Sequence, residues 1–271
     1  MRRLGKNVNG YFGERIDVTR ILADCVEAAR THGWGIEEIP VNERLGLLAL
    51  SRRAQAANHV DPKARRAPRV YLSAGIHGDE PAGPLAVRQL LQENAWPAEC
   101  DLWLCPCLNP EGFLVNCREN QQGLDLNRQY LHPVAAETRA HIAWLERQPG
   151  FDLCFCLHED WEAHGFYVYE LNPDNQPSLA EPILQRVAEV CPIDTSESIE
   201  GRQAQQGIIR PSVDPRSRPD WPESFFLLTR KTRLSYTLEA PSDFPIAVRV
   251  ASLVTAVQTG LANKRGNAIM K

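Results

Sequence analysis

Apolar residues recur along the chain in two alternating patterns. Runs such as LGLLALS (45–51), RVYLSAG (69–75) and FDLCFCLHE (151–159) are short and almost continuously apolar, which is typical of buried strands. The segment 19–32 instead repeats apolar residues on one helical face, with Asp17 placed to cap the helix and Gly33 to end it. A second helical pattern covers 135–148. Strand and helix signals therefore alternate.

The remaining signals continue this alternation. Further strands are predicted at 101–108, 165–171 and 234–240, and further helices at about 80–94, 178–191 and 244–263. The order predicts one α/β domain over 1–271, a mixed sheet with helices on both faces, which residues 1–66 enter through a helix and a strand. The stretch 199–222 has neither period and is predicted to be a long loop, a feature that is often functional.

Composition narrows the class of protein. A hydrophobic fraction of 43% in 271 residues suffices for a sizeable core. The net charge of -4 lacks the basic excess of nucleic-acid binders, so we expect no nucleic-acid partner. The sequence has no secretory signal pattern and no uninterrupted apolar run near the roughly 18 residues of a membrane span. We therefore expect a cytoplasmic protein without a membrane partner, and leave its oligomeric state open.

The eight cysteines are predicted to be reduced apolar side chains. Cys105 and Cys107, like Cys154 and Cys156, are two positions apart, so each pair is expected to share one face of a strand. Zinc sites built from cysteine use a different spacing, commonly CxxC. We therefore predict no functional role for them.

The first candidate chemistry is the segment AGIHGDEPAG, where His77 and Glu80 follow a predicted strand. Ligands in α/β proteins bind at such strand ends. A His and a carboxylate three positions apart across a tight turn can reach one cation, and Gly75 and Gly78 would permit that turn. The alternative is a surface pair at a helix start, where Glu80 only favours the helix dipole.

His158 supplies the third ligand that a catalytic zinc site requires. It ends an apolar strand, as His77 nearly does, so both imidazoles are expected to converge on one edge of the sheet. His164 is expected near the mouth of the site. The other histidines considered are expected to be solvated or capping residues: His32, His59, His132 and His141.

The segment LNPEGFLVNCRENQQGLDLNRQY follows another predicted strand end. It carries Arg118, Asp125, Asn127 and Arg128, a set that suits a substrate with a carboxylate, because guanidinium groups bind carboxylates through paired hydrogen bonds. The alternative is an ordinary loop with Asx turns and surface charges.

Six features, in this order, resemble the zinc carboxypeptidase superfamily: HGDE, NPEG, Arg118, DLNR, the strand-end His158 and the acid in YTLEAP. The resemblance covers about 70–241 and includes a branch of aspartoacylases and succinylglutamate desuccinylases. It implies one Zn²⁺ per chain bound by His77, Glu80 and His158, with Glu239 as the base that acts on zinc-bound water.

The resemblance also assigns roles around this site. Arg118 would stabilise the oxyanion, Asn127 and Arg128 would hold the terminal carboxylate of the substrate, and Asp125 would orient His77. Asp125 could instead form an Asx turn, and Glu239 alone could be a solvated strand end. The chain departs from digestive-type carboxypeptidases, whose mobile tyrosine has no counterpart between 192 and 235.

Three functions remain to be compared. We expect a metallocarboxypeptidase that hydrolyses the amide bond next to a free C-terminal carboxylate of a peptide. The alternative is an N-acyl amino acid deacylase of the aspartoacylase type, although those enzymes add a β-rich domain after the catalytic Glu, and this sequence has room only for a helix there. A third possibility is a non-catalytic protein that binds zinc or a peptide, which the presence of Arg118 and Glu239 disfavours.

Overall fold

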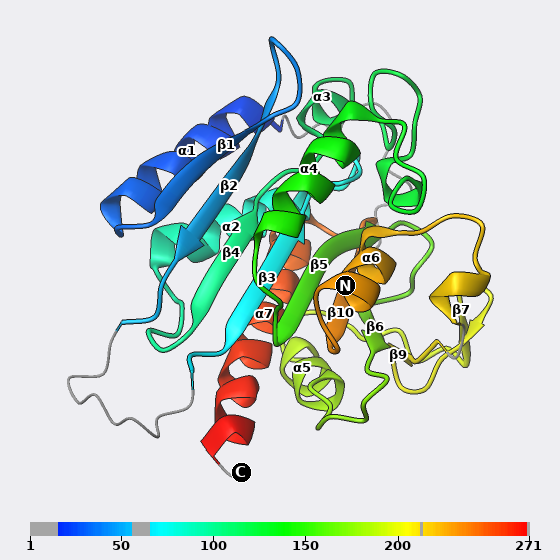
Figure 1. The fold of residues 1–271 in the computed structure, drawn as a ribbon. Helices are drawn as coiled ribbons and strands as arrows, with labels where there is room; N and C mark the ends of the chain where they lie inside the picture. The colour runs from blue at the N-terminus through cyan, green and yellow to red at the C-terminus, as the bar shows by residue number, and fades with distance from the viewer. Residues whose placement is uncertain (1–15, 56–65, 212–213, 270–271) are drawn as a thin grey trace.

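The computed structural model describes residues 16–55, 66–211 and 214–269, and among them an eight-stranded sheet runs through the centre of the molecule (Figure 1). Its order is β1-β2-β4-β3-β5-β10-β6-β9. The strands are β1 (Gly35–Pro40), β2 (Gly46–Arg52), β3 (Arg69–Ala74), β4 (Asp101–Cys105), β5 (Leu153–Asp160), β6 (Tyr167–Leu171), β9 (Ile208–Ile209) and β10 (Ser235–Pro241).

The central strands β4, β3, β5 and β10 are parallel, so their carboxyl ends meet at one edge of the sheet. The flanking pairs β1–β2, β2–β4 and β10–β6 are antiparallel. In β5 every residue from Leu153 to Glu159 is buried, as a strand covered by helices on both faces requires. This confirms the mixed α/β architecture expected from the sequence.

Helices cover both faces of the sheet (Figure 1). One hydrophobic cluster contains residues of α1 (Val18–Thr31), α2 (Ala82–Glu93), α5 (Ala180–Val187) and α7 (Ile246–Ile269). The other cluster contains residues of α4 (Ala136–Arg147) and α6 (Glu223–Arg230). Successive side chains of a β-strand point to opposite faces of the sheet, so each one packs in one cluster or the other. Because both faces are covered, the buried strands appear as continuous apolar runs in the sequence.

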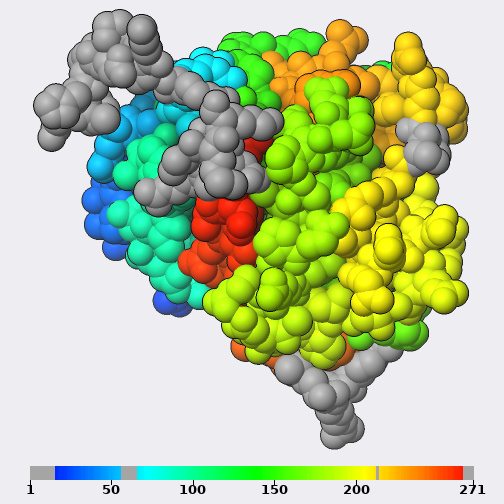
Figure 2. Space-filling model, turned by 90° about the horizontal axis from the view of Figure 1, so that it is seen from below, coloured from blue at the N-terminus to red at the C-terminus, as the bar shows by residue number. Residues whose placement is uncertain are grey.

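The final helix is apolar because it lies against the core. By length and composition alone its Ile246–Lys264 part could cross a membrane, with a mean hydropathy of 1.2, but 44% of that segment is buried. It packs against α2, α5 and β10, and Figure 2 shows it (red) between the blue-green residues and the lime-green segment that includes α5. The expectations of no membrane partner and of a cytoplasmic location stay predictions.

Local signals fixed the ends of several elements. Asp17 caps α1 as predicted, since its Oδ1 accepts a hydrogen bond of 3.0 Å from the backbone N–H of Arg20. Gly33, at φ 71°, follows the helix in the left-handed conformation. The pattern did not predict β1, because only one of its six residues is buried, or the five-residue α3 (Pro110–Leu114).

The stretch 199–222 contains more structure than the predicted long loop. Its start forms a hairpin from β7 (Ser198–Ile199) and β8 (Arg202–Gln203), β9 adds to the edge of the main sheet beside β6, and Pro215–Ser217 is a 3-10 turn (η3). Such two-residue strands are too short to show a period of two in the sequence.

The cysteine predictions hold in part. All eight cysteines are free, and Cys154 and Cys156 share one face of β5 as expected. Cys105 and Cys107 do not share a face, because β4 ends at Cys105 and Cys107 packs in a separate small cluster with Val18.

Candidate metal centre

A tight turn after β3 carries the first two candidate ligands. Gly75 has a φ of 63°, which favours glycine, and the turn lies directly on the loop that follows α3. A Cβ at Gly78 would lie 2.1 Å from the carbonyl carbon of Gly112, so no side chain fits there. The two glycines therefore permit the turn that brings His77 beside Glu80, as the sequence predicted.

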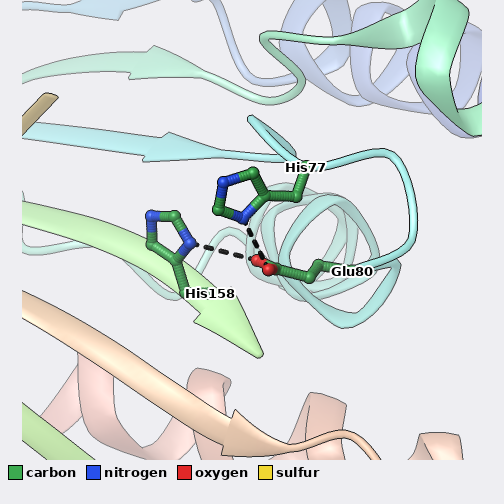
Figure 3. Close-up of side chains that lie close together, drawn as sticks. All are labelled: His77, Glu80 and His158. Carbon is green, nitrogen blue, oxygen red and sulfur yellow. Dashed lines mark hydrogen bonds and ion pairs between the residues drawn. The ribbon is translucent and has the colours of Figure 1, made fainter. Parts of the chain in front are cut away.

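His77, Glu80 and His158 converge at the carboxyl ends of β3 and β5 (Figure 3). The Nδ1 atom of His77 lies 2.5 Å from Oε1 of Glu80, and Nδ1 of His158 lies 3.0 Å from Oε2. All three side chains are buried, and their ligand atoms lie within 4.8 Å of one another. The structure thus brings together the three residues predicted from the sequence. Glu80 and His158 are 78 positions apart in the chain.

The donor set fits zinc. Two imidazole nitrogens and one carboxylate are the ligands of several catalytic zinc sites, which leave a fourth position open. Burial acts to raise the pKa of Glu80, but the two neighbouring imidazoles lower it by more. The net effect is a lowered pKa, so the carboxylate is charged. Burial lowers the pKa of His158, which favours the neutral imidazole that binds metals.

Asp125 lies beside His77 and forms the Asx turn that was the alternative considered for it. Its Oδ1 lies 3.3 Å from Nε2 of His77, without the alignment of a hydrogen bond, and accepts a 2.8 Å hydrogen bond from the N–H of Asn127 in an Asx turn. Its Oδ2 accepts a 3.1 Å bond from Nε of Arg118. Asp125 therefore links the ligand His77 to Arg118, which also lies 3.4 Å from Glu80.

A cavity of about 540 Å³ opens beside the three ligands. Its lining includes all the predicted site residues except Asp125: His77, Glu80, Arg118, Asn127, Arg128, His158 and Glu239. The three candidate metal ligands, a carboxylate and three cationic or amide side chains therefore face one space.

Glu239 reaches this cavity from β10. Parallel pairing places it opposite His158 on β5, and antiparallel pairing places it opposite Tyr167 on β6. Its side chain is 9% exposed, and within the described part of the chain its carboxylate makes no hydrogen bond or ion pair. Burial, with the negative charges of Glu80 and Glu200, raises its pKa well above the ordinary value. It is therefore not a solvated strand end.

Arg128 and Asn127 also line the cavity and lie on the 3-10 turn η2 (Leu126–Arg128). The guanidinium of Arg128 is about half exposed and lies 3.8 Å from Asp220. The Oδ1 atom of Asn127 accepts a 2.9 Å hydrogen bond from the backbone N–H of Glu223, which begins α6. Its amide NH₂ group remains as a donor.

Other cavity residues were missed by sequence reasoning. Tyr169, on β6, lies opposite Thr237 and next to the Glu239 pair in the antiparallel register, and its hydroxyl donates to Glu200. Glu200 and Arg202, on the β7–β8 hairpin, complete this wall. Glu200 has a φ of 49°, in the left-handed region. The only sequence signal was the Glu-Gly pair of a hairpin turn.

A tyrosine thus faces the cavity from a strand, although none lies between 192 and 235. Of three aromatic residues in or just before α6, Phe225 lines the cavity, and Trp221 and Phe226 pack in the core.

The remaining histidines divide as follows. His164 is not among the residues that line the cavity. His141 is not solvated as predicted: it is 1% exposed and its ring nitrogens bind the hydroxyls of Tyr71 and Tyr130. Its place in a helix with many polar residues concealed this burial. His59 lies outside the described residues.

A buried ion pair lies next to the candidate metal ligands. Glu159, next to His158, accepts a 2.6 Å hydrogen bond from Arg249 on α7, and both side chains are fully buried. The backbone N–H of Glu159 donates to Oε2 of Glu80 at 3.1 Å. Removing either member of such a pair is costly, because the other charge stays buried.

Comparisons with known proteins agree with this arrangement. Residues 66–186 match the family model of the succinylglutamate desuccinylase/aspartoacylase catalytic domain. Carboxypeptidase 2 of Trichophyton rubrum is 32% identical over 94 residues, which make up 32% of this chain and 17% of that protein. The chain therefore matches less than a fifth of the length of this curated relative.

Solved structures extend the likeness to most of the fold. A candidate metallopeptidase from Shewanella amazonensis has a TM-score of 0.76 and 23% identity, over 92% of this chain and 93% of that one. A metallo-carboxypeptidase from Burkholderia cenocepacia has a TM-score of 0.63 and 16% identity, over 91% of this chain and 69% of that one. The family model and the fold together confirm the resemblance of this chain to the zinc carboxypeptidase superfamily, including its succinylglutamate desuccinylase/aspartoacylase branch.

Proposed function

We propose that the protein is a zinc-dependent hydrolase that cleaves the amide bond next to a free C-terminal carboxylate of a peptide. One observation carries this proposal: a single cavity is lined by three candidate metal ligands, a buried carboxylate that has no partner among the described residues, and an arginine and an amide able to bind a carboxylate. The relatives named above support the coarser reading, a hydrolase of the carboxypeptidase or deacylase type.

The ligands His77, Glu80 and His158 would hold one Zn²⁺ per chain. When bound to such a set, zinc lowers the pKa of water to about 7 and polarises a carbonyl oxygen. Glu239 takes the proton that the attacking water loses and passes it to the leaving amine. Its burial and its raised pKa suit a carboxylate that must accept and return a proton.

Arg118 and Arg128 have different roles in this proposal. Arg118 lies beside the ligands, 3.4 Å from Glu80, where a guanidinium can stabilise the negative charge that develops on the carbonyl oxygen. Asn127 and Arg128 line the same cavity and bind the substrate carboxylate, Arg128 through charge-assisted hydrogen bonds. This arrangement requires that the scissile amide lie between the two groups.

The family model favours a second candidate, an N-acyl amino acid deacylase. It shares the ligands and the carboxylate-binding residues, because the match over residues 66–186 includes all of them, but it stops before Glu239. The candidate metallopeptidase of Shewanella amazonensis and the metallo-carboxypeptidase of Burkholderia cenocepacia instead resemble this chain over about nine-tenths of its length. We therefore prefer a peptide substrate. A non-catalytic binding protein would not need both Arg118 and Glu239 in the cavity.

An amidated peptide is expected to be cleaved about 10- to 100-fold more slowly than the same peptide with a free C-terminus, and Arg128→Ala is expected to erase most of this difference. Charge-assisted hydrogen bonds to a carboxylate contribute roughly 1.5 to 3 kcal/mol, which corresponds to that factor. The measurement is kcat/KM for both peptides with each enzyme.

Arg216→Ala is the control, because Arg216 is an exposed arginine that pairs with Asp214 and does not line the cavity. It should behave as wild type. Equal cleavage of the two peptides by the wild-type enzyme would refute the proposed substrate class.

A further inference from the structure

A chain of four hydrogen bonds runs from Asn127 to Tyr130, and the backbone between these two residues closes it into a ring. Apart from Asn127, none of its members has a role in the chemistry described above. The ring, here called the Glu223 ring, contains Asn127, Tyr130, His141, Tyr71 and Glu223. Four of these side chains are at most 4% exposed: Tyr130, His141, Tyr71 and Glu223. The ring joins η2, α4, β3 and α6, four elements that are distant in the sequence.

The distances are those of full hydrogen bonds. The Tyr71 hydroxyl donates to Oε1 of Glu223 at 2.9 Å, so it can only accept from Nε2–H of His141, at 2.8 Å. Nδ1 of His141 then accepts from the Tyr130 hydroxyl at 2.7 Å. The ring thereby fixes a neutral imidazole, and burial lowers the pKa of His141 to about 3.

Glu223 connects the buried part of the ring to Asn127, which lines the cavity. Its side chain is held on β3 from two sides, because Ser73 also donates to Oε2 at 2.7 Å. Its backbone N–H donates to Oδ1 of Asn127 at 2.9 Å, so the carboxylate anchors the atom that orients Asn127. Burial raises the pKa of Glu223 to about 7, which makes this carboxyl a costly choice for a position that only needs to fill the core.

The ring holds the carboxylate-binding segment at two points. Asn127 is bound by the N–H of Glu223, and Tyr130 is bound both by His141 and through its own N–H, which donates to the carbonyl of Trp221 at 3.1 Å. Arg128 lies between these points. Its own side chain is about half exposed, with an ion pair at 3.8 Å. Its backbone N–H donates to the carbonyl of Asp125 at 3.1 Å, so the two ring contacts add to this local turn in fixing its backbone.

We propose that Glu223 is a positioning residue which, through the Glu223 ring, fixes Asn127 and Arg128 for binding of the substrate carboxylate. The inference rests on the proposed function for its substrate. If the inference is right, a substitution that breaks the ring far from the cavity weakens binding of the substrate carboxylate and leaves the rate of bond cleavage unchanged.

The test compares two conservative variants that break the ring, Tyr71→Phe and Glu223→Gln, with a matched control, Tyr236→Phe. Tyr236 is likewise fully buried, donates to a buried glutamate, Glu170, at 2.7 Å and accepts a second hydrogen bond, but it lies in the other core cluster. All three variants lose or weaken buried hydrogen bonds, so a loss of stability alone should appear in each.

Tyr71→Phe should raise KM for a free-acid peptide about 3- to 10-fold, the effect of one weakened hydrogen bond, with kcat within about twofold. The ratio of free-acid to amidated cleavage should fall by the same factor. In Glu223→Gln, which keeps hydrogen-bonding atoms at this position, the ratio should fall less. Tyr236→Phe should keep the wild-type ratio. If Tyr71→Phe kept it too, while Asn127→Ala lost it, the inference would be overturned.

A second readout does not depend on activity. The side-chain NH₂ resonance of Asn127, identified by its loss in Asn127→Ala, should shift in Tyr71→Phe and stay in place in Tyr236→Phe. If the wild-type enzyme showed no preference for the free acid, the proposed function would fail and this resonance would decide the inference. An unmoved resonance in Tyr71→Phe would overturn it in every case.

Discussion

Replacing Glu239 by Gln is expected to lower hydrolysis by at least about 10²-fold, the low end of what a positioned acid or base contributes, without loss of metal. The substitution keeps the size of the side chain and removes its basicity. Because Glu239 is buried at the cavity and its carboxylate has no partner among the described residues, no fold contact is lost. Steady-state rates, metal analysis and thermal unfolding of both proteins measure the effect.

Glu162→Gln is the matched control for this experiment. Glu162 also lines the cavity, but it is exposed and lies on the segment after β5. It should retain wild-type activity within a few-fold. A Glu239→Gln enzyme that stayed within the same range would show that another group accepts the proton.

Replacing His158 by Ala is expected to reduce bound zinc from one per chain to a trace, and activity to the background. Three protein ligands are the minimum for a catalytic zinc site, and two remain in this variant. The loss also removes the 3.0 Å contact that holds Glu80 in place. Elemental analysis after dialysis gives the metal content directly.

His132→Ala is the control, because His132 is exposed and does not line the cavity. Circular dichroism shows whether each variant folds. Undiminished zinc in a folded His158→Ala protein would remove this residue from the ligand set.

Much of the fold follows from local patterns. The helix α1 could be predicted to within one residue at each end, because its amphipathic face, the Asp17 cap and Gly33 lie within one short segment. The strand β5 could be predicted because a strand covered on both faces is apolar throughout. By contrast, β1 is mostly exposed, so its side chains give no strand pattern. Its backbone pairing with β2 holds it in the sheet.

The metal centre was predictable for the same reason. His77 and Glu80 are close in sequence, and the rule that parallel strands end at one edge brings in His158. Hydrogen bonds between distant residues could not be predicted. Nothing near Glu223 indicates that its N–H binds Asn127, 96 positions earlier, or that its carboxylate lies under β3. Tyr169 likewise reaches the cavity only because β6 pairs with β10.

The most direct test of the proposed function is a mixed panel of substrates, incubated with the zinc-loaded enzyme and read by mass spectrometry. The panel contains oligopeptides with free C-termini, their amidated counterparts, and N-acetyl and N-succinyl amino acids. Glu239→Gln serves as the blank for contaminating hydrolases.

All the free acids present the carboxylate that Asn127 and Arg128 are proposed to bind, so the two candidate functions differ only on the acyl side of the bond. We predict that the enzyme releases a single C-terminal residue from the free-acid peptides and spares the amidated ones. Hydrolysis confined to the acyl amino acids would contradict the peptidase assignment and establish the deacylase in its place.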